Sequence, residues 1–219
     1  MSTARGARDP VSPDYWDDAC RHLKRRDRVL KRLIPQFGET RLQSRGDAFT
    51  TLARSVVGQQ ISVKAAQSVW NRFAALMEAP GDAIRADAVA ALPTDRLREA
   101  GLSARKAEYL LALAQHFLDG RVHVAQWRTM DDEAIIEELV AIRGIGRWTA
   151  EMFLIFHLMR PNVLPLDDIG LQNGISRAYF SGEPVSRSEI REVAASWAPF
   201  CSVATWYIWR SLDPLPVSY

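Results

Sequence analysis

The chain has 219 residues, of which 47% are hydrophobic and 25% charged, as in an ordinary globular protein of one domain or two small lobes. No apolar stretch approaches the roughly 18 residues of a membrane span, and no apolar core of a secretory signal follows the N-terminus. Two isolated cysteines exclude a disulfide framework and a four-cysteine iron–sulfur cluster, and a net charge of +2 alone indicates no particular partner.

Apolar residues recur at helical spacing along most of the chain, and alternating strand patterns are scarce. We expect an all-α fold. Pro93 and Ser103 are typical helix starts, Gly120 is a stop, and another helix begins near Asp168. The expected helical stretches are residues 15–34, 48–57, 62–77, 103–117, 131–142, 148–159, 188–197 and 203–212.

The most informative segment covers residues 139–150, where a helix is expected to end at Ile142 and a new one to start at Trp148. Between them, Gly144 and Gly146 can adopt positive φ and leave backbone N–H groups uncovered. The N-terminus of the second helix then points at the turn, an arrangement that binds a phosphate oxygen without net charge. A Gly-x-Gly alone is more often a plain helix–turn–helix corner.

The complete twelve-residue segment resembles the helix–hairpin–helix of the DNA glycosylase superfamily, in which a Gly/Pro-rich link and a catalytic aspartate follow the hairpin. The link corresponds to residues 161–166, and two aspartates come directly after it. Within the superfamily the chain is most similar to the DNA-3-methyladenine glycosylase II branch, which acts on alkylated bases. Residues 47–62, 101–109, 148–153 and 197–209 also carry this resemblance.

The resemblance places the catalytic carboxylate at Asp168, the second of the pair. Asp167 is then the better candidate for a helix cap or a supporting role. A base alkylated on a ring nitrogen is already cationic and leaves readily. One carboxylate therefore suffices to stabilise an oxocarbenium-like sugar and to guide a water molecule to C1′.

Trp148 stands where superfamily members that also cut the DNA backbone have a lysine nucleophile, so the resemblance implies hydrolysis without a lyase step. To reach C1′ the enzyme must flip the nucleotide out of the duplex. By resemblance Trp148, Met152 and Trp209 line the pocket for the flipped base, where an electron-rich indole suits a cationic base. For Trp209 a core position is the simpler alternative.

Two segments are expected to contact damaged double-stranded DNA. In the turn at residues 58–62, Gln60 falls at the position from which relatives fill the gap left by the flipped base, whereas Ser62 more simply caps the following helix. The expected DNA-binding residues are Gln59, Gln60, Ile61, Ser62, Arg143, Gly144, Ile145, Gly146, Arg147 and Thr149.

The resemblance implies two helical lobes without an N-terminal β-domain. Residues 1–45 and 166–219 are expected to form the terminal lobe, and residues 46–165 the central lobe. We expect a cytoplasmic monomer, nucleoid-associated if bacterial, that binds no membrane. It needs no cofactor and no catalytic metal, although carbonyls near Val140, Ile142 and Ile145 resemble a structural site for a monovalent cation.

Two other functions remain open from the sequence. The first is a glycosylase for oxidised or mismatched bases, which Trp148 and the lack of a cysteine cluster disfavour. The second is a helix–hairpin–helix module that binds DNA without catalysis, which leaves Asp168 and the aromatic residues unexplained.

Overall fold

The computed structural model describes residues 12–44, 46–77 and 83–212, and within these ranges the protein is helical and contains no strand. This confirms the all-α prediction. The chain divides into two compact units between residues 44 and 45 and again between residues 153 and 154. None of the helices in the described ranges is long and apolar enough to span a bilayer.

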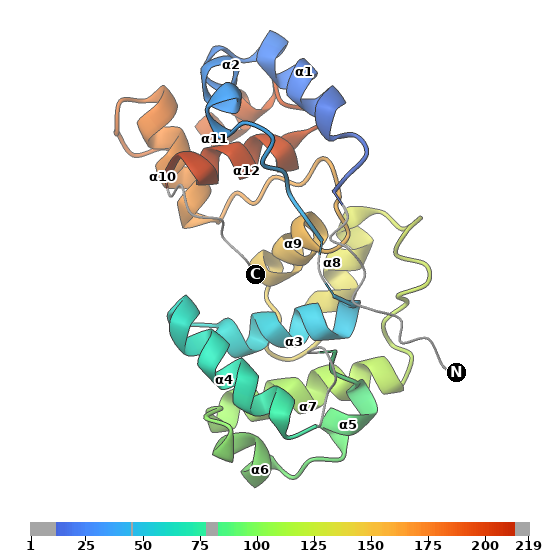
Figure 1. Cartoon of the computed structure of the whole chain (residues 1–219). Helices are drawn as coiled ribbons and strands as arrows, with labels where there is room; N and C mark the ends of the chain where they lie inside the picture. Colours follow the sequence, from blue (N-terminus) through green and yellow to red (C-terminus); the bar gives the residue numbers. More distant parts are fainter. Residues whose placement is uncertain (1–11, 45, 78–82, 213–219) are drawn as a thin grey trace, which may run out of the picture. The chain divides into compact units, whose positions relative to one another are not determined.

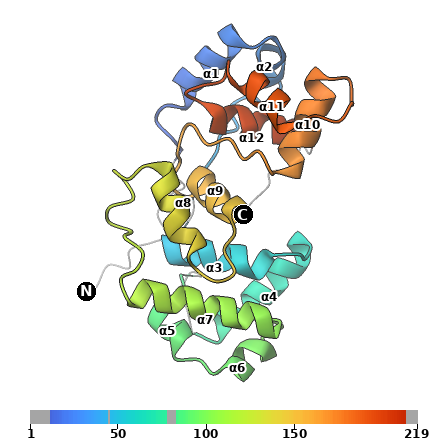
Figure 2. The same ribbon diagram turned by 180° about the vertical axis from the view of Figure 1, so that it is seen from behind.

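The central unit covers the described residues from 46 to 153. Its helices are α3 (Ala48–Gly58), α4 (Val63–Ala75), α5 (Ala86–Ala90), α6 (Thr94–Glu99), α7 (Ala104–Leu118), α8 (Asp132–Val140) and the first part of α9 (Arg147–Phe156). Helix α7 lies beside α3 and α5, as Figures 1 and 2 show from opposite sides.

A run of edge-to-face aromatic contacts forms part of the core of the central unit. Phe49 contacts Phe117, with ring centroids 5.1 Å apart, and Phe117 contacts Trp127. Trp127 in turn contacts Phe153 of α9 at 5.4 Å. These contacts hold α9 against α3 and α7. Helix α9 follows the turn at residues 141–146, the glycine turn, so the end of this turn is fixed.

The terminal unit combines two separate stretches, residues 12–44 and 154–212. It contains α1 (Trp16–Arg26), α2 (Arg28–Leu33), the short 3₁₀ helix η1 (Ile34–Phe37), α10 (Ile169–Tyr179), α11 (Arg187–Ala194) and α12 (Cys201–Leu212). Helix α12 is buried from Cys201 to Ile208 and contacts α1, α2 and α10. Trp16 meets Trp206 edge to face at 5.2 Å.

Asp27 separates α1 from α2, so the expected helical stretch at residues 15–34 is broken. Its backbone is extended, and its Oδ1 accepts the N–H groups of Val29 and Leu30 as the N-cap of α2. The other oxygen, Oδ2, accepts the Tyr179 hydroxyl at 2.8 Å and the Trp197 indole N–H at 3.0 Å. Four hydrogen bonds thus compensate the burial of this carboxylate.

The division at residues 153 and 154 precedes the expected lobe boundary at residue 165, and it falls within α9. The last turn of α9 belongs to the terminal unit. Phe156 stacks on Trp209 with centroids 5.7 Å apart, and the carbonyl of His157 accepts a hydrogen bond from Ser44. Sequence periodicity predicts the helix but does not indicate which neighbours each end of the helix contacts.

Candidate functional site

The glycine turn joins α8 to α9. Helix α8 ends at Val140, and the amide of Ile142 donates to Leu139 O at 3.1 Å. Within the turn, the amide of Ile145 donates to Ile142 O at 3.0 Å, and α9 begins at Arg147. The first N–H groups of α9 therefore face the turn, as an α-helix has no internal acceptor for them.

Gly144 is fixed in this turn for two reasons. Its φ is +94°, in the region that disfavours a side chain, and a Cβ on it would overlap the ring of Tyr109 from α7. Gly146, which as a glycine could also adopt positive φ, does not do so, and a Cβ there would meet nothing within 4 Å. The turn thus requires glycine at residue 144 and leaves open space at residue 146.

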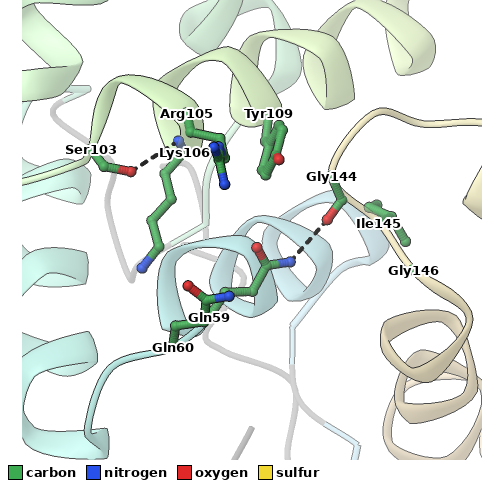
Figure 3. A pocket seen from close by; sticks show the side chains of 9 residues that line it. All are labelled: Gln59, Gln60, Ser103, Arg105, Lys106, Tyr109, Gly144, Ile145 and Gly146. Carbon is green, nitrogen blue, oxygen red and sulfur yellow. Dashed lines mark hydrogen bonds between the residues drawn. The ribbon is translucent and has the colours of Figure 1, made fainter.

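A cavity of about 530 Å³ lies between this turn, the start of α7 and the segment after α3 (Figure 3). No carboxylate lines it, and Arg105 and Lys106 give it positive charge. The residues around it are Gln59, Gln60, Ser103, Arg105, Lys106, Tyr109, Gly144, Ile145 and Gly146. Such a lining suits an anionic group.

Lys106 also has a structural contact. Its ammonium donates to the carbonyl of Val57 near the end of α3 at 2.7 Å, and a cation is favourable at that end of a helix. Burial lowers the pKa of Lys106. Ser103 accepts the amide of Lys106 as the N-cap of α7, as its sequence position predicts.

The arginines of the turn bind carboxylates of the same unit. Arg143 lies 3.0 Å from Glu108. Arg147 donates to Glu133 at 2.9 Å and to Glu151 at 3.1 Å, and the bond to Glu133 raises the pKa of Arg147 and lowers that of Glu133. Their positive charge is therefore partly compensated within the protein, and a direct contact of either arginine with DNA stays a prediction.

The remaining predicted residues of α9 differ in exposure. Trp148 is 37% exposed, whereas Thr149 and Met152 are buried at 6% and 3%. Trp148 and Met152 belong to the central unit and Trp209 to the terminal unit. The pocket predicted from these three residues stays a prediction, as does the DNA contact of Thr149.

The tip segment, residues 59–62, follows α3. Gln60 is exposed with φ of +58°, and Ile61 is 39% exposed. Ser62 accepts the amide of Ala65 and caps α4, as predicted. Gln59 is half-buried, and its side-chain amide donates to Gly144 O at 2.9 Å. Of the residues expected to contact DNA here, Gln60, Ile61 and Ser62 are exposed, whereas Gln59 is half-buried.

In the terminal unit, Asp168 is a buried carboxylate, 8% exposed, at the N-cap of α10. Its Oδ1 accepts the backbone N–H of Leu171 at 2.6 Å and the indole N–H of Trp209 at 2.7 Å. The positive end of the α10 dipole lies beside the carboxylate. The two hydrogen bonds fix the direction of the carboxylate, and the helix dipole favours a negative charge at this end of α10.

Gly170 makes the approach of Trp209 to Asp168 possible. A Cβ on Gly170 would lie 3.0 Å from Asp168 Oδ1 and 3.1–3.2 Å from the Trp209 ring, closer than most side-chain contacts. Trp209 also stacks on Phe156, with the ring planes 11° apart. The indole is thus held in one orientation.

Asp168, and not Asp167, caps α10, so the first of the two expected roles of Asp167, a helix cap, is wrong, and the second, a supporting role, stays a prediction. Asp167 pairs with Arg187 and is half-exposed, while Asp168 turns inward to the first amides of α10. The reason is local: the backbone of Asp168 is extended immediately before the helix, and its side chain is the one that reaches the third amide.

No group of three or more His, Cys, Asp or Glu side chains in the part of the chain that the structure describes has the arrangement of a metal site. The carbonyl of Ile142, which we expected near a monovalent cation, accepts the amide of Ile145 and retains a second lone pair. That site stays a prediction.

Sequence reasoning did not assign a role to Tyr109, Lys106, Gly170 or Phe156. Tyr109 and Lys106 lie on one face of the helix starting at Ser103, which the helical spacing could have indicated. Nothing in the sequence links Gly170 or Phe156 to Trp209, because those contacts form only when α10, α9 and α12 come together.

The model of the family described as HhH-GPD superfamily base excision DNA repair protein matches residues 53–200. The chain is 30% identical to a putative DNA-3-methyladenine glycosylase of Bacillus subtilis over 84% of its length and 31% identical to DNA-3-methyladenine glycosylase 1 of Schizosaccharomyces pombe over 87%. It spans 66% of the bacterial relative and 85% of the yeast one.

Two solved structures have the same arrangement of helices. A DNA-3-methyladenine glycosidase from Bacillus halodurans gives a TM-score of 0.80 at 31% identity, covering 93% of this chain and 92% of the other. The S. pombe enzyme Mag1, in complex with abasic DNA, gives 0.79 at 29% identity, covering 92% and 99%.

Proposed function

Because the chain belongs to the HhH-GPD superfamily of base excision DNA repair proteins, we propose that it is a DNA glycosylase for alkylated bases. Its substrates are bases such as 3-methyladenine and 7-methylguanine in duplex DNA, and its reaction is hydrolysis of the N-glycosidic bond. Curated relatives named DNA-3-methyladenine glycosylase support the substrate class, and the complex of the related Mag1 with abasic DNA supports DNA as the partner.

The observation that carries the proposal is the environment of Asp168. The Trp209 indole and the Leu171 amide hold its carboxylate at the N-terminus of α10 and fix its direction. An oriented anion stabilises positive charge that develops on the sugar as the bond to the base breaks. The same carboxylate can accept a proton from the attacking water.

The leaving group needs no acid catalyst in this scheme. A base methylated on a ring nitrogen departs as a neutral molecule when the bond breaks, because it is cationic beforehand. The proposal therefore requires one carboxylate and no redox or metal cofactor. With Trp148 at the position of the lyase lysine, the strand stays intact after the base is released.

DNA binding is assigned to the central unit. The first amides of α9 and the cavity with Arg105 and Lys106 offer donors to phosphate oxygens. The exposed tip at Gln60 and Ile61 supplies the side chains that fill the gap left by the flipped nucleotide. We further propose that the enzyme acts as a monomer in the compartment that holds the genome.

The test compares the wild-type protein with Asp168→Asn on methylated duplex DNA, with released bases identified by chromatography and the strand analysed before and after alkali. The wild type is expected to release 3-methyladenine and to leave the strand uncut until alkali is added. Asp168→Asn is expected to lose at least about 10²–10³-fold in rate, the cost of removing a transition-state electrostatic contact. Asp167→Asn, a change of the neighbouring half-exposed acid, is the matched control and keeps nearly full activity.

Three outcomes contradict the proposal in different ways. Release of 8-oxoguanine in place of methylated bases indicates a glycosylase for oxidised bases. Strand cleavage without alkali indicates a lyase. Binding of DNA by both proteins with no base released indicates a non-catalytic binding module.

A further inference from the structure

Gln59 and Tyr109 hold the glycine turn from two sides in the central unit. The side-chain amide of Gln59 donates to the carbonyl of Gly144, across 85 residues of sequence. The ring of Tyr109 fills the place where a Cβ of the same residue would lie. Figure 3 shows both side chains directed at Gly144 from different elements, the end of α3 and the helix α7.

A third contact connects those two elements directly. The ammonium of Lys106, also on α7, donates to the carbonyl of Val57, two residues before Gln59. Lys106 therefore joins the start of α7 to the end of α3, and Tyr109 joins α7 to the glycine turn. Gln59 joins the end of α3 to the same turn. A set of three elements joined in this way resists displacement of any one of them.

The tip segment begins at Gln59, which makes one of these three contacts. Gln59 is half-buried and directed at Gly144, whereas the next residue, Gln60, is exposed and has positive φ. Two adjacent glutamines thus have different surroundings: one contacts the protein and the other faces solvent. The predicted DNA contact of Gln59 would require it to leave Gly144.

We propose that Gln59 is a positioning residue that fixes the glycine turn relative to the tip segment and does not itself contact DNA. On this proposal the two DNA-facing segments move as one rigid body. The phosphate-binding amides then stand at a set distance from the side chains that enter the helix stack. A free protein already ordered in this way loses less entropy when it binds DNA.

The consequences of this inference for DNA binding rest on the proposed function. Its first test uses the DNA-free protein and does not depend on that function. Amide hydrogen exchange of residues 144–146 is followed by NMR in the DNA-free protein for wild type, Gln59→Met and Gln60→Met. Gln59→Met keeps the length of the side chain and removes the donor, and Gln60→Met makes the same change one residue away at the exposed tip.

We expect Gln59→Met to raise exchange at the glycine turn roughly three- to tenfold, the range that corresponds to one hydrogen bond. Gln60→Met leaves exchange there unchanged. Gln59→Glu, which has the same shape, no donor and a carboxylate facing a carbonyl, raises it at least as much. If Gln59→Met fails to fold, Gln59→Glu decides the question by the same measurement.

The second measurement is affinity for a duplex containing an abasic-site analogue and for an undamaged duplex. Gln59→Met is expected to weaken both, because the displaced turn serves every duplex, whereas Gln60→Met weakens chiefly the duplex with the gap. Unchanged exchange at the turn in Gln59→Met, together with weaker DNA binding, would make Gln59 a direct DNA contact and overturn the proposal. An inactive wild-type protein would contradict the proposed function and leave the exchange result valid.

Discussion

The glycine turn and the Asp168 site are built by different means. In the turn the groups that we propose to bind phosphate are backbone amides, and their direction is set by the backbone of Gly144 and by the Tyr109 ring beside it. At Asp168 the group that we propose to be catalytic is a side chain, and its direction is set by donors from Leu171 and Trp209. One site depends on the space around a residue without a side chain, and the other depends on individual hydrogen bonds.

This difference predicts different responses to substitution. A backbone site tolerates most side-chain changes but fails where a Cβ overlaps a neighbour. A side-chain site keeps its fold when a donor is removed and loses orientation of the acceptor. Paired substitutions within each region separate the two behaviours.

The largest effect is expected for Gly144→Ala. The new methyl group overlaps the Tyr109 ring, and φ of +94° is unfavourable for alanine. Backbone strain and overpacking together lower the free energy of unfolding by about 2–4 kcal/mol, measured by denaturant unfolding. Affinity for undamaged duplex DNA falls at least tenfold as the turn moves.

The matched control is Gly146→Ala, two residues away in the same turn. A Cβ there meets nothing within 4 Å, so stability changes by less than about 0.5 kcal/mol. Equal losses in the two variants would show that glycine flexibility, and not the space filled by Tyr109, is what the turn requires.

A smaller effect is expected for Trp209→Phe. Phenylalanine keeps an aromatic ring to stack on Phe156 and removes the donor to Asp168 Oδ1. The rate of base release at saturating DNA falls roughly 10- to 150-fold, the factor that corresponds to the loss of one hydrogen bond to a charged group.

The control is Trp197→Phe, which removes an indole donor from Asp27, the other carboxylate in the terminal unit with this arrangement. Here stability falls by about 1.5–3 kcal/mol, and the rate per folded molecule is unchanged. A loss of rate in Trp197→Phe equal to that in Trp209→Phe would mean that the indole at Asp168 only supports the fold.

The smallest effect is expected in the rate at which iodoacetamide labels the two thiols. This rate measures opening of the terminal unit and not of the central unit. Cys20 and Cys201 both lie there and are buried, and burial raises the pKa of Cys201 to about 11. At pH 8 about one Cys201 in a thousand is a thiolate, so iodoacetamide reacts slowly until the unit opens. Trp197→Phe is expected to accelerate labelling, and Gly144→Ala is not.

The same pKa gives a sign for the pH dependence of stability. The neutral thiol of Cys201 is favoured in the folded state, so its contribution is complete below the ordinary thiol value of 9.0 and is lost as pH rises toward 11. Replacement of Cys201 by alanine is expected to remove this alkaline decline. An identical decline in the alanine variant would assign it to other groups.

Local features of the fold were predictable from sequence. Helical spacing located most of the helices but missed α5, and Ser62 and Ser103 marked two starts because a cap acts on amides three residues away. The segment at residues 139–150 predicted the glycine turn because the glycines and the two flanking helices are neighbours in the sequence. The break at Asp27 was missed because the carboxylate interrupts the helix through its own cap and through Trp197, 170 residues later.

The candidate site divides in the same way. Asp168 was assigned by family resemblance, which rests on the local order of the hairpin, the Gly/Pro-rich link and the pair of aspartates. The Trp209 donor, 41 residues away, and the steric need for Gly170 follow from packing among α9, α10 and α12 that no local pattern encodes. Arg147 is a further example: the sequence places a cation beside the turn, but its ion pairs with Glu133 and Glu151 are visible only in the structure.

The terminal unit is assembled from two stretches with the whole central unit between them in the chain. During synthesis, Trp16 and Asp27 leave the ribosome long before their partners Trp206 and Trp197 exist. At ordinary rates of elongation this interval is roughly ten to thirty seconds. Helices α1 and α2 therefore keep apolar residues such as Trp16 uncovered until α12 has been made, and during this interval residues 16–33 are available to a chaperone.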